Sequence, residues 1–194
     1  ACNPSEVALA LGELGREAAG VRVPGAFDGF EIAVRAILGQ QVSVKAARTL
    51  AKRFVAAFGE SIATPWPELA SLFPTAARIA ECSMADIAAL GVVGARAKSI
   101  IALAAAVAAG KLQLDPGAPL ETTLDGLRDL PGVGEWTAQY IAMRALGWPD
   151  AFPHSDLGVM KALGVKSPQA ALAASEKWRP WRAYAVMHLW NSLA

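Results

Sequence analysis

Residues 130–134 read LPGVG and lie between two segments whose apolar residues recur at helical spacing. Proline lacks the backbone N–H that a helix interior needs, so Pro131 ends the first of these helices. The two glycines can adopt backbone conformations that other residues avoid, and Val133 can fill the gap between the helices. The segment therefore predicts a tight helix-turn-helix hairpin over residues 123–146, and the rest of the chain must pack around it.

Helix start signals recur along all 194 residues, whereas alternating β-branched runs are scarce. Residues 64–74, which hold three prolines, predict an irregular connection. Thr122 or Thr123 is expected to begin the first helix of the hairpin. Capping residues and prolines predict further helix starts at Asp28, Ser43, Ser83, Ser155, Ser167 and Pro180. The sequence thus predicts an all-α fold: a compact bundle of about ten helices in two lobes that share one core across residues 1–194.

The overall charge says little about partners, because 18 basic residues face 17 acidic ones and the pI is near 8.0. A domain that binds nucleic acid through bulk charge typically has a pI above about 9. Local groups of basic residues could still contribute to binding, or could be solvated helix faces. The two groups are Arg35, Lys45, Arg48, Lys52 and Arg53, and Lys177, Arg179 and Arg182.

The cysteine and hydropathy patterns favour a cytoplasmic protein. Cys2 and Cys82 have neither zinc nor iron-sulfur spacing, which fits a reducing compartment. The longest uncharged apolar stretch, residues 99–110, is too short to cross a bilayer, so no membrane association is expected. His154 and His188 lack metal-ligand spacing and are expected to be structural or surface residues.

The hairpin also predicts a binding site for a phosphate. Backbone amides at the start of its second helix, at Gly134 and Glu135, can bind an anion without any lysine. For a GxG motif alone, an ordinary packing turn is the stronger interpretation. The full LPGVG between two amphipathic helices matches the helix-hairpin-helix motif of DNA-handling proteins, which predicts DNA binding but not catalysis.

Five segments in the same order resemble the helix-hairpin-helix glycosylase superfamily, and within it the 3-methyladenine DNA glycosylase II family. They are CNPSEVALALGELG, VPGAFDGFEIAVRAILGQQVSV, LPGVGEWTAQYIAMRALG, DAFPHSDLGVMKALG and KWRPWRAYAVMHLW. The resemblance covers essentially the whole chain. It implies a monomeric, bacterial-type, nucleoid-associated enzyme that removes damaged bases from double-stranded DNA. The N-terminal α/β domain typical of that family is expected to be absent from this sequence.

The resemblance assigns the catalytic carboxylate to Asp156 in FPHSDLGV. With Ser155 as the expected N-cap, Asp156 lies in the first helical turn, where the helix dipole favours a carboxylate. A fixed anion stabilises the sugar as it becomes oxocarbenium-like during cleavage of the N-glycosidic bond, or it orients or activates the attacking water. Both roles stay open.

Residue 136 indicates the reaction subtype. Superfamily members that also nick DNA resemble GVGxKTA here and use the lysine to form a Schiff base, whereas this chain has GVGEWTA. Since Trp136 cannot be that nucleophile, the sequence predicts hydrolysis that leaves an abasic site without strand cleavage.

The resemblance also implies the surroundings of a flipped-out base. It places Trp136, Tyr140, Trp190 and Gln40 at the base pocket, where electron-rich rings attract a cationic alkylated base. Trp136 and Tyr140, four residues apart, could instead simply pack on a helix face. Gln41 stands where relatives carry an apolar wedge. Gly158 stands where they tend to carry a bulkier residue, and it is expected to loosen the wall beside Asp156. DNA contacts are expected at Gln41, Gly132, Gly134, Glu135 and Thr137.

No organic cofactor is required by this chemistry. The resemblance implies a monovalent cation, Na⁺ or K⁺, on the backbone carbonyls of Arg128, Leu130 and Val133. The main alternative function is a noncatalytic helix-hairpin-helix DNA-binding module. A small-molecule enzyme or interaction scaffold is favoured only if the protein does not bind duplex DNA, and a mismatch or oxidised-base glycosylase remains an alternative within the class.

Overall fold

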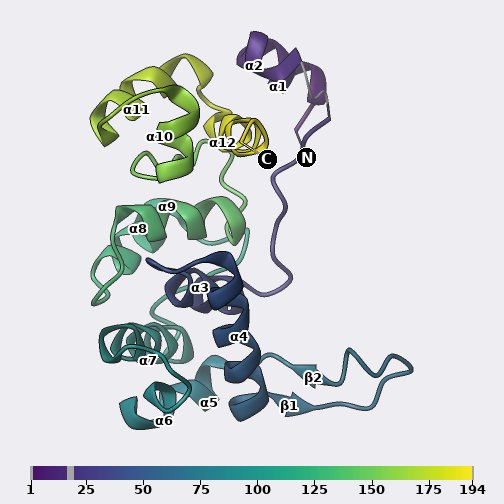
Figure 1. Cartoon of the computed structure of the whole chain (residues 1–194), viewed down its shortest axis with the longest axis vertical. Coiled ribbons are helices and arrows are strands. Elements are labelled where there is room, and N and C mark those ends of the chain that lie inside the picture. Colours follow the sequence, from purple (N-terminus) through teal and green to yellow (C-terminus); the bar gives the residue numbers. More distant parts are fainter. Residues whose placement is uncertain (1, 17–19, 194) are drawn as a thin grey trace.

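The computed structural model describes residues 2–16 and 20–193. Helices make up most of these residues, which confirms the all-α prediction (Figure 1). The elements of the described residues are α1 (Pro4–Leu11), α2 (Glu13–Arg16), α3 (Gly29–Leu38), α4 (Val44–Phe58), β1 (Glu60–Ser61), β2 (Ser71–Leu72), α5 (Ala76–Ala80), α6 (Met84–Ala88), α7 (Gly94–Ala108), α8 (Leu120–Arg128), α9 (Glu135–Arg144), α10 (Leu157–Leu163), α11 (Pro168–Ser175), η1 (Glu176–Trp178) and α12 (Arg182–Asn191).

The helices form two groups that meet at the hairpin helix α9. In Figure 1, α1, α2 and α10 to α12 lie at the top, and α3 to α9 lie below them. Helix α3 packs against both α7 and α9. Buried hydrophobic side chains from both groups belong to one cluster, which includes Leu11, Ile37, Leu103, Ile141 and Val186. Burial of this cluster is the main favourable contribution to folding.

Local capping explains most helix starts. The side chains of Asp28, Ser43, Ser83 and Ser167 each accept a bond from a backbone N–H in the first turn, as predicted. The predicted start at Pro180 is wrong by two residues, because α12 begins at Arg182.

Two further predicted helix starts are wrong. Helix α8 begins at Leu120 rather than at Thr122 or Thr123, and Pro119 lies at its N-cap. Helix α10 is capped by Asp156 rather than by Ser155. The aspartate therefore precedes the first turn instead of lying in it, and its side chain is aimed at the free amides of that turn.

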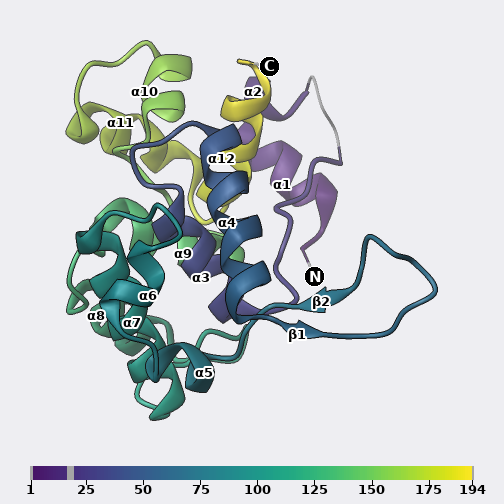
Figure 2. The same ribbon diagram turned by 60° about the horizontal axis from the view of Figure 1, so that its bottom comes forward.

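A short ribbon interrupts the helical pattern. Strands β1 and β2 pair antiparallel, with Glu60 opposite Leu72 and Ser61 opposite Ser71. Figure 2 shows that the ribbon and its long loop project away from α4. The sequence predicted only an irregular connection over residues 64–74, because two-residue strands carry no periodic signal. Helix α5, five residues long, was not predicted for the same reason.

No helix within residues 2–16 and 20–193 combines the length and the apolar character that crossing a membrane requires.

Candidate functional site

The turn between α8 and α9 requires glycine at residue 132. Gly132 has a φ of +74°, and a Cβ at this position would lie 2.4 Å from the Ser99 hydroxyl oxygen. Val133 is buried between the helices, as predicted. Gly134 is the N-cap of α9 and supplies no side-chain cap, so the first-turn amides have no side-chain acceptor. These amides and the positive end of the helix dipole make the turn suitable for an anion.

A chain of hydrogen bonds links α8, α9 and the α9–α10 connection next to this turn. Arg128 donates from Nε and Nη2 to the two carboxylate oxygens of Glu135, at 2.8 and 3.2 Å. The hydrogen bonds from Arg128 hold the pKa of Glu135 below its usual value. Gln139 donates to the same carboxylate at 2.8 Å, and its side-chain oxygen accepts the backbone N–H of Phe152 at 3.0 Å. The Glu135 side chain is thus committed to the hairpin, so any DNA contact at this residue falls to its backbone amide.

Gln40 joins the α3–α4 loop to the hairpin. Its side-chain nitrogen donates to the carbonyl oxygen of Gly132 and to the hydroxyl of Thr137, both at 3.0 Å. Thr137 is buried, so its hydroxyl serves to hold Gln40. The next residue, Gln41, is exposed and has a φ of +53°, a conformation that L-residues rarely adopt. The bonds of Gln40 and this turn leave the Gln41 side chain at the surface.

A cleft of about 790 Å³ opens between the α3–α4 loop, the hairpin and the start of α10. Leu157, which lies at its edge, is 79% exposed. The lining of the cleft includes predicted site residues together with neighbours that were not predicted. The lining residues are Gly39, Gln40, Gln41, Val42, Ser43, Gly132, Gly134, Trp136, Thr137, Ser155, Asp156 and Leu157, so Asp156 and Trp136 face the same space as the hairpin glycines.

Three N–H groups from three segments hold the Asp156 carboxylate. Oδ1 accepts the backbone N–H of Val159 and the indole N–H of Trp190, each at 2.9 Å. Oδ2 accepts the indole N–H of Trp136, also at 2.9 Å. Hydrogen bonds from three directions fix the orientation of this carboxylate. Because a carboxylate accepts about four such bonds, about one acceptor position is left for another group.

The predicted aromatic residues lie together, but only one of them faces the cleft. Trp136 stacks on Tyr140 with ring centroids 5.2 Å apart, and Tyr140 lies 6.5 Å from Trp190. Tyr140 and Trp190 are not among the residues that line the cleft. Their contacts instead support Trp136 and Asp156. In the described structure Trp136 therefore forms part of the wall of the cleft, with the other two rings behind it.

Gly158 lets Trp190 approach Asp156. A Cβ at this position would lie 3.1 Å from Asp156 Oδ1 and 3.3 Å from Trp190 Cδ1, which is tighter than ordinary contacts. A larger residue would push the carboxylate and the indole apart. The sequence interpretation that Gly158 loosens this wall is therefore wrong for this chain, because the glycine allows the wall to close.

The structure separates the two groups of basic residues. Arg182, which is buried, and Arg179 both pair with Asp150, and both also pair with Glu176, so these arginines hold the α9–α10 connection against α12. These two arginines are therefore structural rather than part of a free basic surface. His188 is buried away from the cleft, and burial lowers the pKa of its imidazole. This matches its expected structural role.

The sequence did not predict two supporting features, which are the hydrogen bonds of Gln139 and the close packing at Gly158. Gln139 carries a signal, since a polar residue on an otherwise buried helix face must find a partner. Its partner Phe152 N–H cannot be read from sequence spacing. The close packing at Gly158 has no sequence signal without the three-dimensional position of Trp190.

The sequence is similar to known DNA repair proteins. Residues 34–171 match the family described as HhH-GPD superfamily base excision DNA repair protein. Over 181 residues, 91% of this chain, the sequence is 47% identical to the probable bifunctional transcriptional activator/DNA repair enzyme AlkA of Mycobacterium tuberculosis, of which the match covers 36%. Over 189 residues it is 39% identical to DNA-3-methyladenine glycosylase 2 of Escherichia coli, covering 97% of this chain and 66% of that protein.

Solved structures share the fold. The 3-methyladenine DNA-glycosylase from Archaeoglobus fulgidus superposes with a TM-score of 0.81 at 25% sequence identity, covering 97% of this chain and 69% of that one. The chain thus spans between about a third and two thirds of the length of the two curated relatives above.

Proposed function

Because the chain belongs to the HhH-GPD superfamily of base excision DNA repair proteins, we propose that it is a DNA glycosylase for alkylated bases of the 3-methyladenine type. One observation carries the proposal: the Asp156 carboxylate, held by two indole N–H groups, faces the cleft beside the hairpin turn. The names of the relatives from E. coli and A. fulgidus support the same activity.

In the proposed complex the hairpin binds a phosphate of the damaged strand. The amides at the start of α9 act as donors, and the rigid turn at Gly132 sets their direction. The exposed Gln41 enters the duplex where the base has left, because Gln40 anchors its loop to the hairpin. The damaged base rotates into the cleft against Trp136.

Asp156 acts on the sugar in this proposal. As the bond between C1′ and the base nitrogen breaks, its electron pair leaves with the base and positive charge develops on the sugar. The fixed carboxylate stabilises that charge. Water adds to C1′ and loses a proton, which gives an abasic site. Since about one acceptor position of the carboxylate is left, Asp156 can orient that water while acting mainly through its charge.

The aromatic contacts favour a cationic base. An alkylated purine carries positive charge, which the face of Trp136 attracts and which also makes the base a good leaving group. Trp136 offers no amine for a Schiff base, and its N–H is committed to Asp156. We therefore propose that this chain cleaves the N-glycosidic bond without nicking DNA, and that it works as a monomer.

The hairpin carbonyls suit a monovalent cation by their chemistry, since carbonyl oxygens are ligands for hard cations. Leu130 O accepts the Val133 N–H at 3.2 Å, so a second lone pair of this oxygen remains for an ion. Arg128, Leu130 and Val133 would hold Na⁺ or K⁺ there, and such an ion would add positive charge beside the bound phosphate.

The proposal is tested with Asp156→Asn. Asparagine keeps the N-cap bond to Val159 but removes the negative charge. Release of methylated bases from duplex DNA, measured in single turnovers, should fall by about 10²- to 10³-fold. Binding to a duplex with an abasic-site analogue should remain within a few-fold of that of the wild-type protein.

Asp115→Asn is the matched control, because Asp115 makes a loop hydrogen bond to the Gly117 N–H away from the cleft. It should release bases at the wild-type rate. If Asp156→Asn also releases bases at that rate, the chain is not the proposed enzyme and the noncatalytic module is favoured. Alkali-free gels from the same reactions test for strand cleavage, which should not occur.

A further inference from the structure

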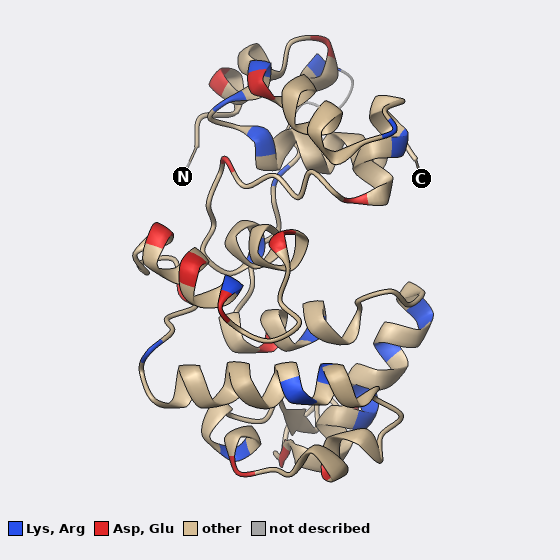
Figure 3. Ribbon diagram, turned by 90° about the vertical axis from the view of Figure 1, so that its left-hand side faces the viewer, with Lys and Arg blue, Asp and Glu red and all other residues tan. Residues whose placement is uncertain are grey.

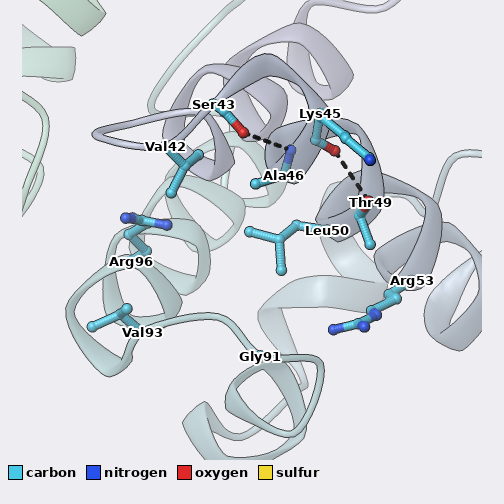
Figure 4. A pocket seen from close by; sticks show the side chains of 10 residues that line it. All are labelled: Val42, Ser43, Lys45, Ala46, Thr49, Leu50, Arg53, Gly91, Val93 and Arg96. Carbon is cyan, nitrogen blue, oxygen red and sulfur yellow. Dashed lines mark hydrogen bonds between the residues drawn. The ribbon is translucent and has the colours of Figure 1, made fainter.

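A second groove, of about 520 Å³, lies next to the cleft. It runs between α4 and the turn that joins α6 to α7 (Figure 4). Lys45, Arg53 and Arg96 line it, and no acidic residue is among its described lining residues. Figure 3 shows lysines and arginines gathered along α4 and the facing end of α7. The groove is therefore a concentrated basic site on a chain with almost no net charge.

The three basic side chains have no carboxylate partner within residues 2–16 and 20–193. By contrast, Arg35, Arg128, Arg179 and Arg182 are all in ion pairs. Arg53 donates from Nη1 to the carbonyl oxygen of Leu90 at 3.1 Å, which directs its guanidinium across the groove toward Gly91. A positively charged groove without internal counterions attracts a polyanion.

The floor of the groove is apolar. Leu50 lies between Arg53 and Arg96 in Figure 4, and Val93 lies across from it with 61% of its surface exposed. An apolar floor between cations fits a sugar–phosphate backbone, whose deoxyribose contacts the floor while its phosphates contact the cations.

The groove and the cleft share a wall. Val42 and Ser43 line both, so the α3–α4 loop separates the groove from the hairpin. With the damaged strand on the hairpin and Gln41 inserted at the lesion, the other strand of the duplex lies on the far side of this loop. We propose that the groove binds the phosphate backbone of the strand opposite the damaged base. This inference rests on the proposed function for the position of the lesion.

The test uses the double variant Lys45→Ala with Arg96→Ala. Arg53 is left in place because its bond to Leu90 supports the α6–α7 turn. Lys111→Ala with Lys166→Ala is the matched control, since both lysines are exposed and line neither the groove nor the cleft. Affinities for a duplex with an abasic-site analogue, and for the damaged strand alone, are measured over a range of KCl concentrations.

The slope of log affinity against log salt for the duplex should become shallower by about 0.9 for each phosphate that a removed side chain had neutralised, or by about 1.8 in the groove variant. The single strand should be bound as by the wild-type protein, and the control should keep the wild-type slope. Replacing single phosphates of the opposite strand with neutral methylphosphonates should weaken wild-type binding at one or two positions, and should not weaken the groove variant further there.

An unchanged duplex slope overturns the groove as a DNA site. An equal loss on the single strand shows that the groove binds the damaged strand and overturns the strand assignment. Because the abasic analogue requires no chemistry, these results are independent of base release by Asp156→Asn. The groove and the glycosylase proposal can therefore fail separately.

Discussion

Replacing Gln139 with methionine should lower the free energy of unfolding by about 2 kcal/mol. Gln139 and Phe152 are both buried, and the glutamine oxygen accepts the Phe152 backbone N–H at 3.0 Å. Methionine has a similar length and helix propensity but no strong acceptor, so it leaves that N–H without a partner. An unsatisfied buried donor costs about 1–3 kcal/mol.

The second hydrogen bond of Gln139 adds little to this figure. Its partner Glu135 is partly exposed and keeps its bonds to Arg128, so water can replace the lost donor. The apolar thioether recovers part of the loss through burial. The net effect thus remains near the cost of the orphaned N–H.

Urea denaturation at pH 7 measures the change, with an unchanged dependence on denaturant as the sign that the folded state is intact. Gln169→Met on an exposed helix face is the control and should stay within about 0.5 kcal/mol of the wild-type stability. Hydrogen exchange should accelerate at the Phe152 amide in Gln139→Met. A variant as stable as the wild type, with a protected Phe152 amide, would refute the assigned hydrogen bond.

Two further changes test the hairpin. Gly132→Ala should destabilise the protein more than Gly147→Ala. Both glycines have a positive φ, but of the two only Gly132 has a neighbour, Ser99, where the Cβ would lie. Equal melting temperatures of the two variants would argue against this clash, and adding Ser99→Ala should relieve it. In Glu135→Gln the free energy of unfolding should fall less steeply as the pH is lowered. The folded-state pKa of Glu135 is depressed, so the stabilisation by its carboxylate is fully present above the unfolded pKa of about 4.3 and is lost as the pH falls through the folded pKa. Thermal unfolding between pH 7 and pH 3 measures this, and a variant that follows the wild-type curve would contradict it.

The helical class and the hairpin could be predicted because their signals are local. Asp28, Ser43 and Ser167 cap helices through bonds that span only two or three residues, and Gly132 is marked by the LPGVG sequence itself. The resemblance to glycosylases identified Asp156 and Trp136 as site residues, and both line the same cleft in the structure. Errors occurred where two neighbouring residues could both cap a helix, as at Ser155 and Asp156.

What holds the site together was decided only by the tertiary structure. The indole of Trp190 lies 34 residues after Asp156, and Gln40 lies 92 residues before Gly132, so sequence spacing carries no information about either bond. The folded core brings these hydrogen-bond partners together by packing α12 against α10 and α3 against α9. The sequence by itself determined most of the helices and where the hairpin turns. Only the packing determined that Tyr140 and Trp190, which were predicted to line the pocket, instead lie behind Trp136 and Asp156. Aromatic rings and N–H groups take the positions in which they pack against other rings and form hydrogen bonds.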